Sequence, residues 1–179
     1  PWQTVSMVGY LFHRYELDQA ANLSELRRLV ESLGVFFGPC LLDGSPLEAL
    51  RGAQRSSVLC QLPYSTLPEE HLARITGRRV VSVPLPVGLR ATATWLRSLG
   101  PALNLPDRTI SDLVQREQDR LSPRLDLSRR FLHGKTVAVA ADTPLAAGLL
   151  LLAQELGLAP RLVILLDRSF GGEAALRRL

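Results

Sequence analysis

The chain has 179 residues, of which 46% are hydrophobic, and its 21 basic and 17 acidic residues give a net charge of +4. This is enough material for the buried core of one or two domains, and no apolar run approaches the roughly 18 residues needed to cross a bilayer. Aromatic residues make up only 6%, and the arginines are spread along the chain among acidic residues. Nucleic-acid-binding surfaces cluster basic and aromatic residues, so we expect neither a nucleic-acid nor a membrane partner.

The cysteine content and the start of the chain suggest its setting. Cys40 and Cys60 are too few for a disulfide framework or a zinc site, which favours a reducing cytoplasmic location. The chain begins at Pro1, without an initiator methionine and just before a strand-like run. We therefore expect a segment of a longer cytoplasmic protein.

The first half of the chain alternates short apolar runs with helical patterns. The predicted strands are Val5–Gly9, Val35–Leu42, Ser57–Leu62 and Arg79–Val83. N-capping boxes at residues 22–25, 45–48 and 66–69 are expected to open the helices between them. Short buried strands joined by crossover helices are typical of a parallel sheet.

A helical region follows this sheet. The pattern predicts one helix over Leu89–Leu99, ended by Gly100 and Pro101, and a longer helix opened by Asp107. Pro123 is expected to interrupt the longer helix, because proline lacks the amide that the helical ladder requires. A short helical segment then runs to Leu132.

A second α/β unit begins at Gly134. It comprises a strand at Thr136–Ala141, a leucine-rich helix with Thr143 as N-cap, and a strand at Leu162–Leu166. Two strands cannot complete such a sheet, so we expect this unit to be truncated.

The predicted fold is therefore α/β: a Rossmann-like or flavodoxin-like parallel sheet of about four strands with flanking helices, then a helical bridge and a partial second unit. The corresponding domains are residues 1–88, 89–133 and 134–179. Neither a P-loop, nor G-x-G-x-x-G after the first strand, nor H-E-x-x-H, nor G-x-S-x-G occurs. This argues against a self-contained nucleotide enzyme or hydrolase.

Candidate site residues follow the predicted strands, at the carboxyl edge where ligands of open α/β sheets bind. His13 and Arg14 lie in the loop after the first strand, either as cofactor contacts or as part of a polar loop packed on a neighbouring domain. Cys60 ends the third strand, either as a thiolate ligand of a soft metal or iron–sulfur cluster or as a small core thiol. Cys40, inside the second strand, is expected to be a core thiol.

Several short motifs, taken in order, resemble the nitrogenase component 1 family, which includes the molybdenum–iron protein subunits, cofactor-assembly scaffolds and dark-operative protochlorophyllide reductase. The motifs are Val5-Ser6-Met7-Val8-Gly9, Glu25 through Gly34, Pro84-Leu85-Pro86-Val87-Gly88, Thr94-Trp95-Leu96-Arg97, Leu132 through Val139, and Leu156-Gly157-Leu158-Ala159-Pro160. They run nearly from end to end of the chain.

The resemblance implies a three-domain subunit, of which this chain holds the middle domain and the start of the third. It implies an iron–sulfur or related metal cluster in the intact subunit, with none expected in the isolated segment, which should be inactive alone. It also implies two partners, a homologous component 1 subunit and an ATP-dependent iron protein that supplies electrons. In catalytic members and some scaffolds of the family, a cysteine at the place of Cys60 ligates the active-site cofactor, whereas several relatives have no ligand there. The residues that follow here, Gln61-Leu62-Pro63-Tyr64, depart from the pattern of the catalytic members.

Three functions stay open on the sequence. The first is an electron-accepting reductase subunit that carries a metal cluster and passes electrons to a substrate. The second is a non-catalytic scaffold or partner subunit of the same family. The third is an unrelated α/β protein that binds a small molecule or nucleotide sugar.

Overall fold

The structure is a computed structural model, and it describes residues 3–10, 18–41, 46, 48 and 50–167. The strands are β1 (Thr4–Val8), β2 (Phe36–Cys40), β3 (Val58–Gln61), β4 (Arg79–Ser82), β5 (Thr136–Ala141) and β6 (Ala159–Leu165). The helices are α1 (Gln19–Glu31), α2 (Leu50–Ala53), α3 (Glu69–Thr76), α4 (Gly88–Ala102), α5 (Asp107–Leu132) and α6 (Thr143–Glu155).

The chain divides into two compact units. Unit 1 comprises residues 1–83 and 97–113, and unit 2 comprises residues 84–96 and 114–179. Each of the helices α4 and α5 therefore belongs partly to one unit and partly to the other. The domains expected from the sequence, residues 1–88, 89–133 and 134–179, remain a prediction for the intact protein.

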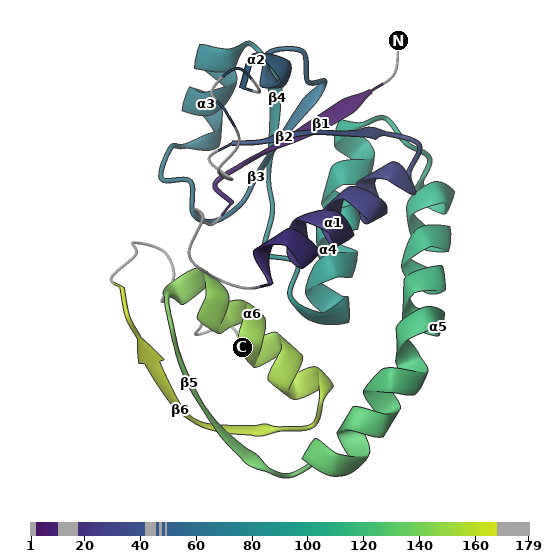
Figure 1. Ribbon diagram of the computed structural model, residues 1–179, viewed down its shortest axis with the longest axis vertical. Coiled ribbons are helices and arrows are strands. Elements are labelled where there is room, and N and C mark those ends of the chain that lie inside the picture. Colours follow the sequence, from purple (N-terminus) through teal and green to yellow (C-terminus); the bar gives the residue numbers. More distant parts are fainter. Residues whose placement is uncertain (1–2, 11–17, 42–45, 47, 49, 168–179) are drawn as a thin grey trace. The chain divides into compact units, whose positions relative to one another are not determined.

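Unit 1 contains a parallel four-stranded sheet in the order β2-β1-β3-β4, which confirms the predicted fold (Figure 1). Because β2 lies on one side of β1 and β3 on the other, the chain reverses its direction of winding between β1 and β3. The β1–β2 pairing contains an irregularity between Val5 and Met7, so the two residues Gly38 and Pro39 oppose one residue of β1.

Helices cover both faces of this sheet. On one face, Val8, Leu59 and Val80 form a buried cluster with Leu72 of α3. On the other face, the guanidinium of Arg27 in α1 lies 5.0 Å from the centre of the Phe37 ring. The Arg79 guanidinium on that face donates to the carbonyl oxygen of Ala102, at 3.0 Å, where α4 ends. Figure 1 shows the same arrangement, with α2 and α3 on one side of the sheet and α1 and the end of α4 on the other.

Unit 2 is built on the parallel pair β5 and β6. Val139 and Ala141 of β5 are buried against Ala146 of α6, with partly buried leucines around them. Leu149, Leu150, Leu151 and Leu152 are all partly buried, and none is exposed. The helix thus contacts protein around much of its circumference, as its leucine content predicts.

The predicted N-capping boxes are wrong where the structure describes them. Helix α1 begins at Gln19, so Asn22 and Glu25 lie inside it, and Glu25 pairs instead with Arg28 at 2.7 Å. The N-cap of α3 is Pro68, without a side-chain cap. The remaining box, residues 45–48, includes positions outside the described residues. Capping motifs place a helix start only when the preceding residues cannot be helical, and Gln19 to Ala21 are good helix formers.

At α6 the N-cap is Asp142, whose carboxylate accepts from the Leu145 amide at 3.3 Å. Thr143, the predicted N-cap, is the first helical residue. Its hydroxyl and its amide both donate to Asp167 Oδ1, at 2.7 and 2.8 Å. The predicted helix start is wrong by one residue. Asp and Thr are both favourable N-caps, so the sequence does not distinguish Asp142 from Thr143. The partner of Thr143, Asp167, is distant in sequence.

Two predicted helix breaks are also wrong. Helix α4 passes through Gly100 and Pro101 to end at Ala102, and α5 is continuous across Pro123 to Leu132. Pro101 lies in the last turn, where the loss of one hydrogen bond matters least, and Leu99 and Leu103 beside it are almost fully buried. Around Pro123, the pairs Glu117–Arg120 at 2.7 Å and Asp126–Arg129 at 2.9 Å support the helix on both sides.

Candidate functional site at the carboxyl edge of the four-stranded sheet

The candidate site lies where β1 and β3 end. These strands are parallel neighbours, with Val8 opposite Gln61, so the segments that follow them leave the sheet at the same edge. The winding direction reverses between these two strands, and this is the position at which open α/β sheets bind ligands. The strand order β2-β1-β3-β4 therefore contains the switch point that such a site requires.

Cys60 is the penultimate residue of β3. It lies between Met7 of β1 and Val81 of β4, and its side chain is fully buried, at 0% exposure. Side chains alternate between the faces of a strand, so Cys60 faces the α1 side together with Val58. Met7 and Val58 are themselves exposed by no more than 1%. Cys40, at 2% exposure, is buried as predicted, and neither cysteine forms a disulfide.

Leu62 continues the strand beyond its formal end. The Leu62 amide donates to the carbonyl oxygen of Val8 at 2.8 Å, and the Val83 amide donates to the backbone carbonyl oxygen of Gln61 at 3.0 Å. Because the ladder continues, Leu62 lies on the same face as Cys60, one step closer to the carboxyl edge. Leu62 is buried to 1% exposure, so an apolar side chain separates the thiol from that edge.

A turn after Leu62 packs on the end of β1. The Ser65 amide donates to the carbonyl oxygen of Leu62 at 3.1 Å, which closes the turn. Gly9 has a φ of +70°, and a Cβ there would lie 2.6 Å from the Leu62 oxygen and also collide with Ser65. Only glycine fits such a conformation at such a close approach. The backbone of the turn thus occupies the space directly above the β1–β3 boundary.

Gln61 anchors this turn from the α3 face of the sheet. It is 5% exposed, and its amide nitrogen donates to Ser65 Oγ at 2.9 Å and to the carbonyl oxygen of Leu67 at 2.6 Å. Its amide oxygen accepts from the Ser82 hydroxyl at 3.2 Å. A buried amide with satisfied donors and acceptor rigidifies its surroundings. Residues 61–67 therefore form one hydrogen-bonded unit.

The other predicted site residues are not brought to this position by the described structure. His13 and Arg14 lie outside the described residues. The prediction that Cys60 ligates a metal stays a prediction. The sequence reasoning missed Gln61 and Gly9, although the signal was present: a glutamine that ends an otherwise apolar strand must find partners when it is buried.

The described residues around Cys60 do not fit a metal cluster. Cluster thiolates need an approach path and polar or positive surroundings, whereas Met7, Leu62 and Val81 are apolar and the thiol is fully buried. Among the described residues, no group of three or more His, Cys, Asp or Glu side chains could hold a metal ion.

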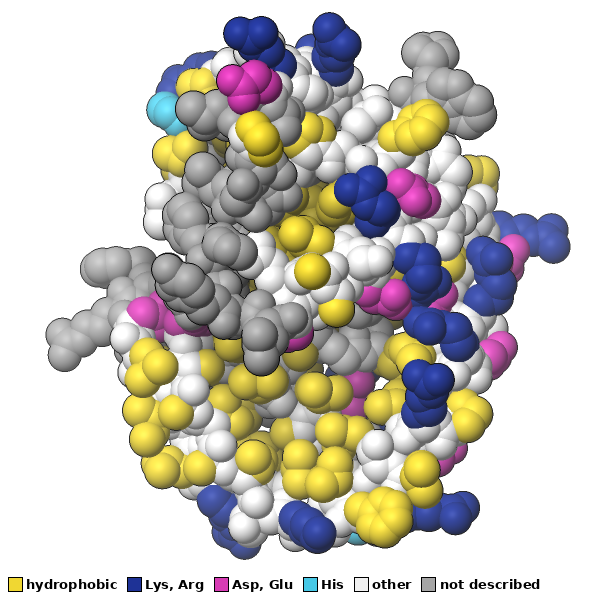
Figure 2. Space-filling model, viewed as in Figure 1, with side chains coloured by type: hydrophobic (Ala, Val, Ile, Leu, Met, Phe, Trp, Pro, Cys, Tyr) yellow, Lys and Arg dark blue, Asp and Glu magenta, His cyan; other side chains and the backbone are white. Residues whose placement is uncertain are grey.

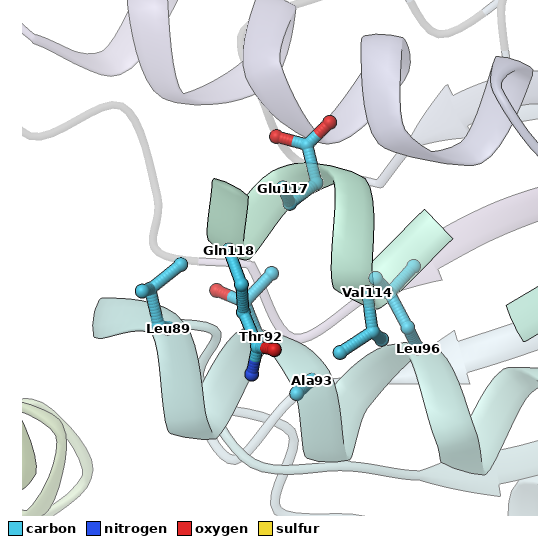
Figure 3. Close-up of a pocket in the computed structure, with 7 residues that line it drawn as sticks. All are labelled: Leu89, Thr92, Ala93, Leu96, Val114, Glu117 and Gln118. Carbon is cyan, nitrogen blue, oxygen red and sulfur yellow. The ribbon is translucent and has the colours of Figure 1, made fainter. Parts of the chain in front are cut away.

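A small hollow occurs in unit 2 between α4 and α5. It holds about 190 Å³ of space, partly open to solvent, and is lined by Leu89, Thr92, Ala93, Leu96, Val114, Glu117 and Gln118. Figure 3 shows Gln118 reaching from α5 towards Thr92, while the Glu117 carboxylate points away from α4. That carboxylate pairs with Arg120 at 2.7 Å, and the Thr92 hydroxyl donates to the carbonyl oxygen of Gly88 at 2.7 Å. The side chains of Thr92 and Glu117 thus already have partners, and we interpret the hollow as a packing gap between the two helices.

The face of the β5–β6 pair that points away from α6 is open. Ala138 and Ala140 of β5 are exposed there, opposite Leu162 and Ile164 of β6, which are 52% and 48% exposed. In Figure 2, hydrophobic side chains gather over the region where α6, β5 and β6 lie in Figure 1. We call Ala138, Ala140, Leu162 and Ile164 the open face.

In the described part of the chain no helix is both long and apolar enough to span a membrane.

Together, the 2-1-3-4 parallel sheet and the parallel pair β5–β6 define the chain as an α/β protein of flavodoxin-like winding. Comparison with known proteins gives the family. Residues 11–178 match the family described as nitrogenase component 1 type oxidoreductase. Because this match covers most of the chain, the chain belongs to that family.

Curated relatives agree with this assignment. The chain is 28% identical over 168 residues to one of the subunits of the light-independent protochlorophyllide reductase of Heliobacterium modesticaldum, a match that covers 87% of this chain and 30% of the relative. It is 27% identical over 161 residues to the nitrogenase molybdenum–iron protein beta chain of Bradyrhizobium diazoefficiens, covering 80% of this chain and 30% of that one. The chain therefore spans about a third of the length of these relatives.

Solved structures show the same fold. Nitrogenase Cp1 at pH 6.5 superposes with a TM-score of 0.73 at 13% identity, over 100% of this chain and 35% of the other. A manganese-bound periplasmic metal-binding protein from Candidatus Liberibacter asiaticus gives a TM-score of 0.52 at 10% identity, over 98% of this chain and 74% of the other. At these identities the likeness concerns the fold alone.

Proposed function

We propose that the intact protein is a subunit of a nitrogenase component 1-like reductase complex, which receives electrons from an ATP-dependent iron protein and delivers them through a metal cluster to a substrate. The observation that carries this proposal is the family match over residues 11–178. The two relatives are named as a reductase subunit and as a beta chain, and these names favour a protein that works beside a homologous partner.

The described residues contribute a rigid framework to this function. The carboxyl edge of the unit 1 sheet is bounded by the Gln61-anchored turn, which fixes the ends of β1 and β3 relative to each other. A neighbouring domain or subunit that docks at this edge would meet preorganised backbone, which lowers the entropy lost on docking. When bound, the cluster would supply the redox chemistry.

The second candidate is a non-catalytic scaffold or partner subunit of the same family. The full burial of Cys60 favours it, because the cysteine expected to act as a ligand faces an apolar core. Both candidates predict a complex with a homologous subunit, and they differ in electron uptake.

The test uses the full-length protein, purified without oxygen together with the homologous subunit that accompanies it. We expect iron in the complex, measured by plasma mass spectrometry. We also expect ATP-dependent oxidation of the reduced iron protein from the same organism, followed by stopped-flow absorbance. Complex formation without faster oxidation would favour the scaffold. A protein that binds neither iron nor a homologous subunit would refute both candidates.

A further inference from the structure

We infer that Cys60 of this protein is a core thiol, shielded from the carboxyl edge by Leu62 and by the turn that Gln61 anchors, so that a cluster in the complex takes its ligands from elsewhere. This inference rests on the proposed function, since it concerns the place of the cluster in such a complex. It also separates this chain from members of the family in which the equivalent strand supplies a ligand.

The first step in the argument is the order of side chains along one face of β3. Val58, Cys60 and Leu62 follow one another at alternate positions, and their exposures are 1%, 0% and 1%. A ligand that approached Cys60 from the carboxyl edge would have to displace Leu62. Removing a buried leucine side chain from its packing is strongly unfavourable.

The second step is the turn above Leu62. Its backbone is held by the Ser65–Leu62 hydrogen bond and by the contact with Gly9, and Gln61 ties it to Leu67. Leu62 therefore cannot move away from Cys60 unless this hydrogen-bonded unit opens. Opening would leave the buried amide nitrogen of Gln61 without its two acceptors in the turn, which is unfavourable.

The third step is chemical. The residues paired with Cys60 across the sheet are Met7 and Val81. These side chains offer neither positive charge nor hydrogen-bond donors, both of which stabilise a thiolate. Apolar neighbours of this kind are typical of a thiol that fills space in a core.

The experiment compares the alkylation rates of the two cysteines in the full-length protein. Trypsin releases Cys60 in the peptide of residues 56–74 and Cys40 in the peptide of residues 29–51, each with a single cysteine. Timed N-ethylmaleimide labelling followed by mass spectrometry then measures both rates in one sample. Cys40 lies in the same unit and is buried to a similar degree, so it reports global unfolding.

In the wild-type protein we expect both cysteines to react slowly, each at least about 100-fold slower than in the denatured protein, because reaction requires opening. Leu62→Ala should accelerate Cys60 by at least about tenfold relative to Cys40. Leu72→Ala is the matched control, since Leu72 is equally a buried leucine of unit 1 but packs on the opposite face of the sheet. It should accelerate both cysteines alike.

Iron content provides a second readout. Cys60→Ala, with Cys60→Val as a second variant to fill the core, should leave the iron content of the complex unchanged. Rapid wild-type alkylation of Cys60 with slow alkylation of Cys40, or the loss of iron in either folded variant, would overturn the inference. Because labelling needs no electron transfer, the inference can fail while the proposed function stands, and the reverse also holds.

Discussion

At the residue scale, the contact that stands out in unit 2 is made by Glu155. Its two carboxylate oxygens accept from the amides of Leu89 and Arg90, at 2.9 and 2.7 Å. These amides open α4 and have no partner within the helix. Gly88 has a φ of +81°, and a Cβ there would lie 2.8 Å from a Glu155 oxygen. The end of α6 thus caps α4 in place of a local N-cap.

Glu155→Ala should lower the free energy of unfolding by about 1–3 kcal/mol, because two amides lose their acceptor and the helix dipole loses a favourable charge. Glu155→Gln keeps one acceptor oxygen and should lose less. Urea denaturation followed by circular dichroism measures both. Glu70→Ala is the control, since Glu70 is exposed in the first turn of α3. An equal loss in the Ala and control variants would show that the cap contributes nothing.

At the scale of elements, α5 is a helix that accommodates a proline in its interior. It runs through Pro123 without a break, and the Ser122 hydroxyl donates to the carbonyl oxygen of Gln118 at 2.7 Å beside it. Pro123→Ala restores the missing amide in an already helical backbone. It should raise the free energy of unfolding by about 1–3 kcal/mol, measured in urea. A destabilised Pro123→Ala variant would mean that the proline is required in the helix.

The open face of β5 and β6 makes a second prediction at this scale. Exposed apolar strand residues favour association between molecules, so the 179-residue chain should self-associate as its concentration rises. Replacing Leu162 and Ile164 by aspartate should shift it towards the monomer in sedimentation velocity experiments. Ile75→Asp is the control, because the Ile75 side chain is likewise exposed, at 59%, but lies on α3. If the double variant associates as strongly as the wild type, another surface is responsible.

At the scale of the whole molecule, the two sheets should differ in local stability. All four residues of β3 are buried, whereas most residues of β6 are exposed. Opening of β6 therefore exposes little new apolar surface. Hydrogen exchange should be at least about 100-fold slower in β1 and β3 than in β6, measured by mass spectrometry of peptic fragments. Equal protection would show that the units unfold as one.

The sequence by itself determined the fold class and the family. Four short apolar runs separated by helical patterns predict a parallel sheet, because a strand buried on both faces needs a continuous apolar run and a crossover helix. The motifs around Pro84 and Leu132 gave the family resemblance that the comparison confirmed. Strand β5 matches its predicted range residue for residue, whereas β6 begins at Ala159, before the predicted start at Leu162.

Only the tertiary structure decided the helix ends and the packing around the candidate site. The partners of Thr143 and Glu155 come from segments distant in sequence, and local propensity contains no information about them. The same is true of Cys60. In a sequence, a cysteine at the end of a strand is equally compatible with a ligand and with a core residue, because the accessibility of its thiol depends on which residues pack above it. Here that is Leu62 and a turn held by Gln61, and their place over the thiol follows from the pairing of β1 with β3 rather than from any local motif.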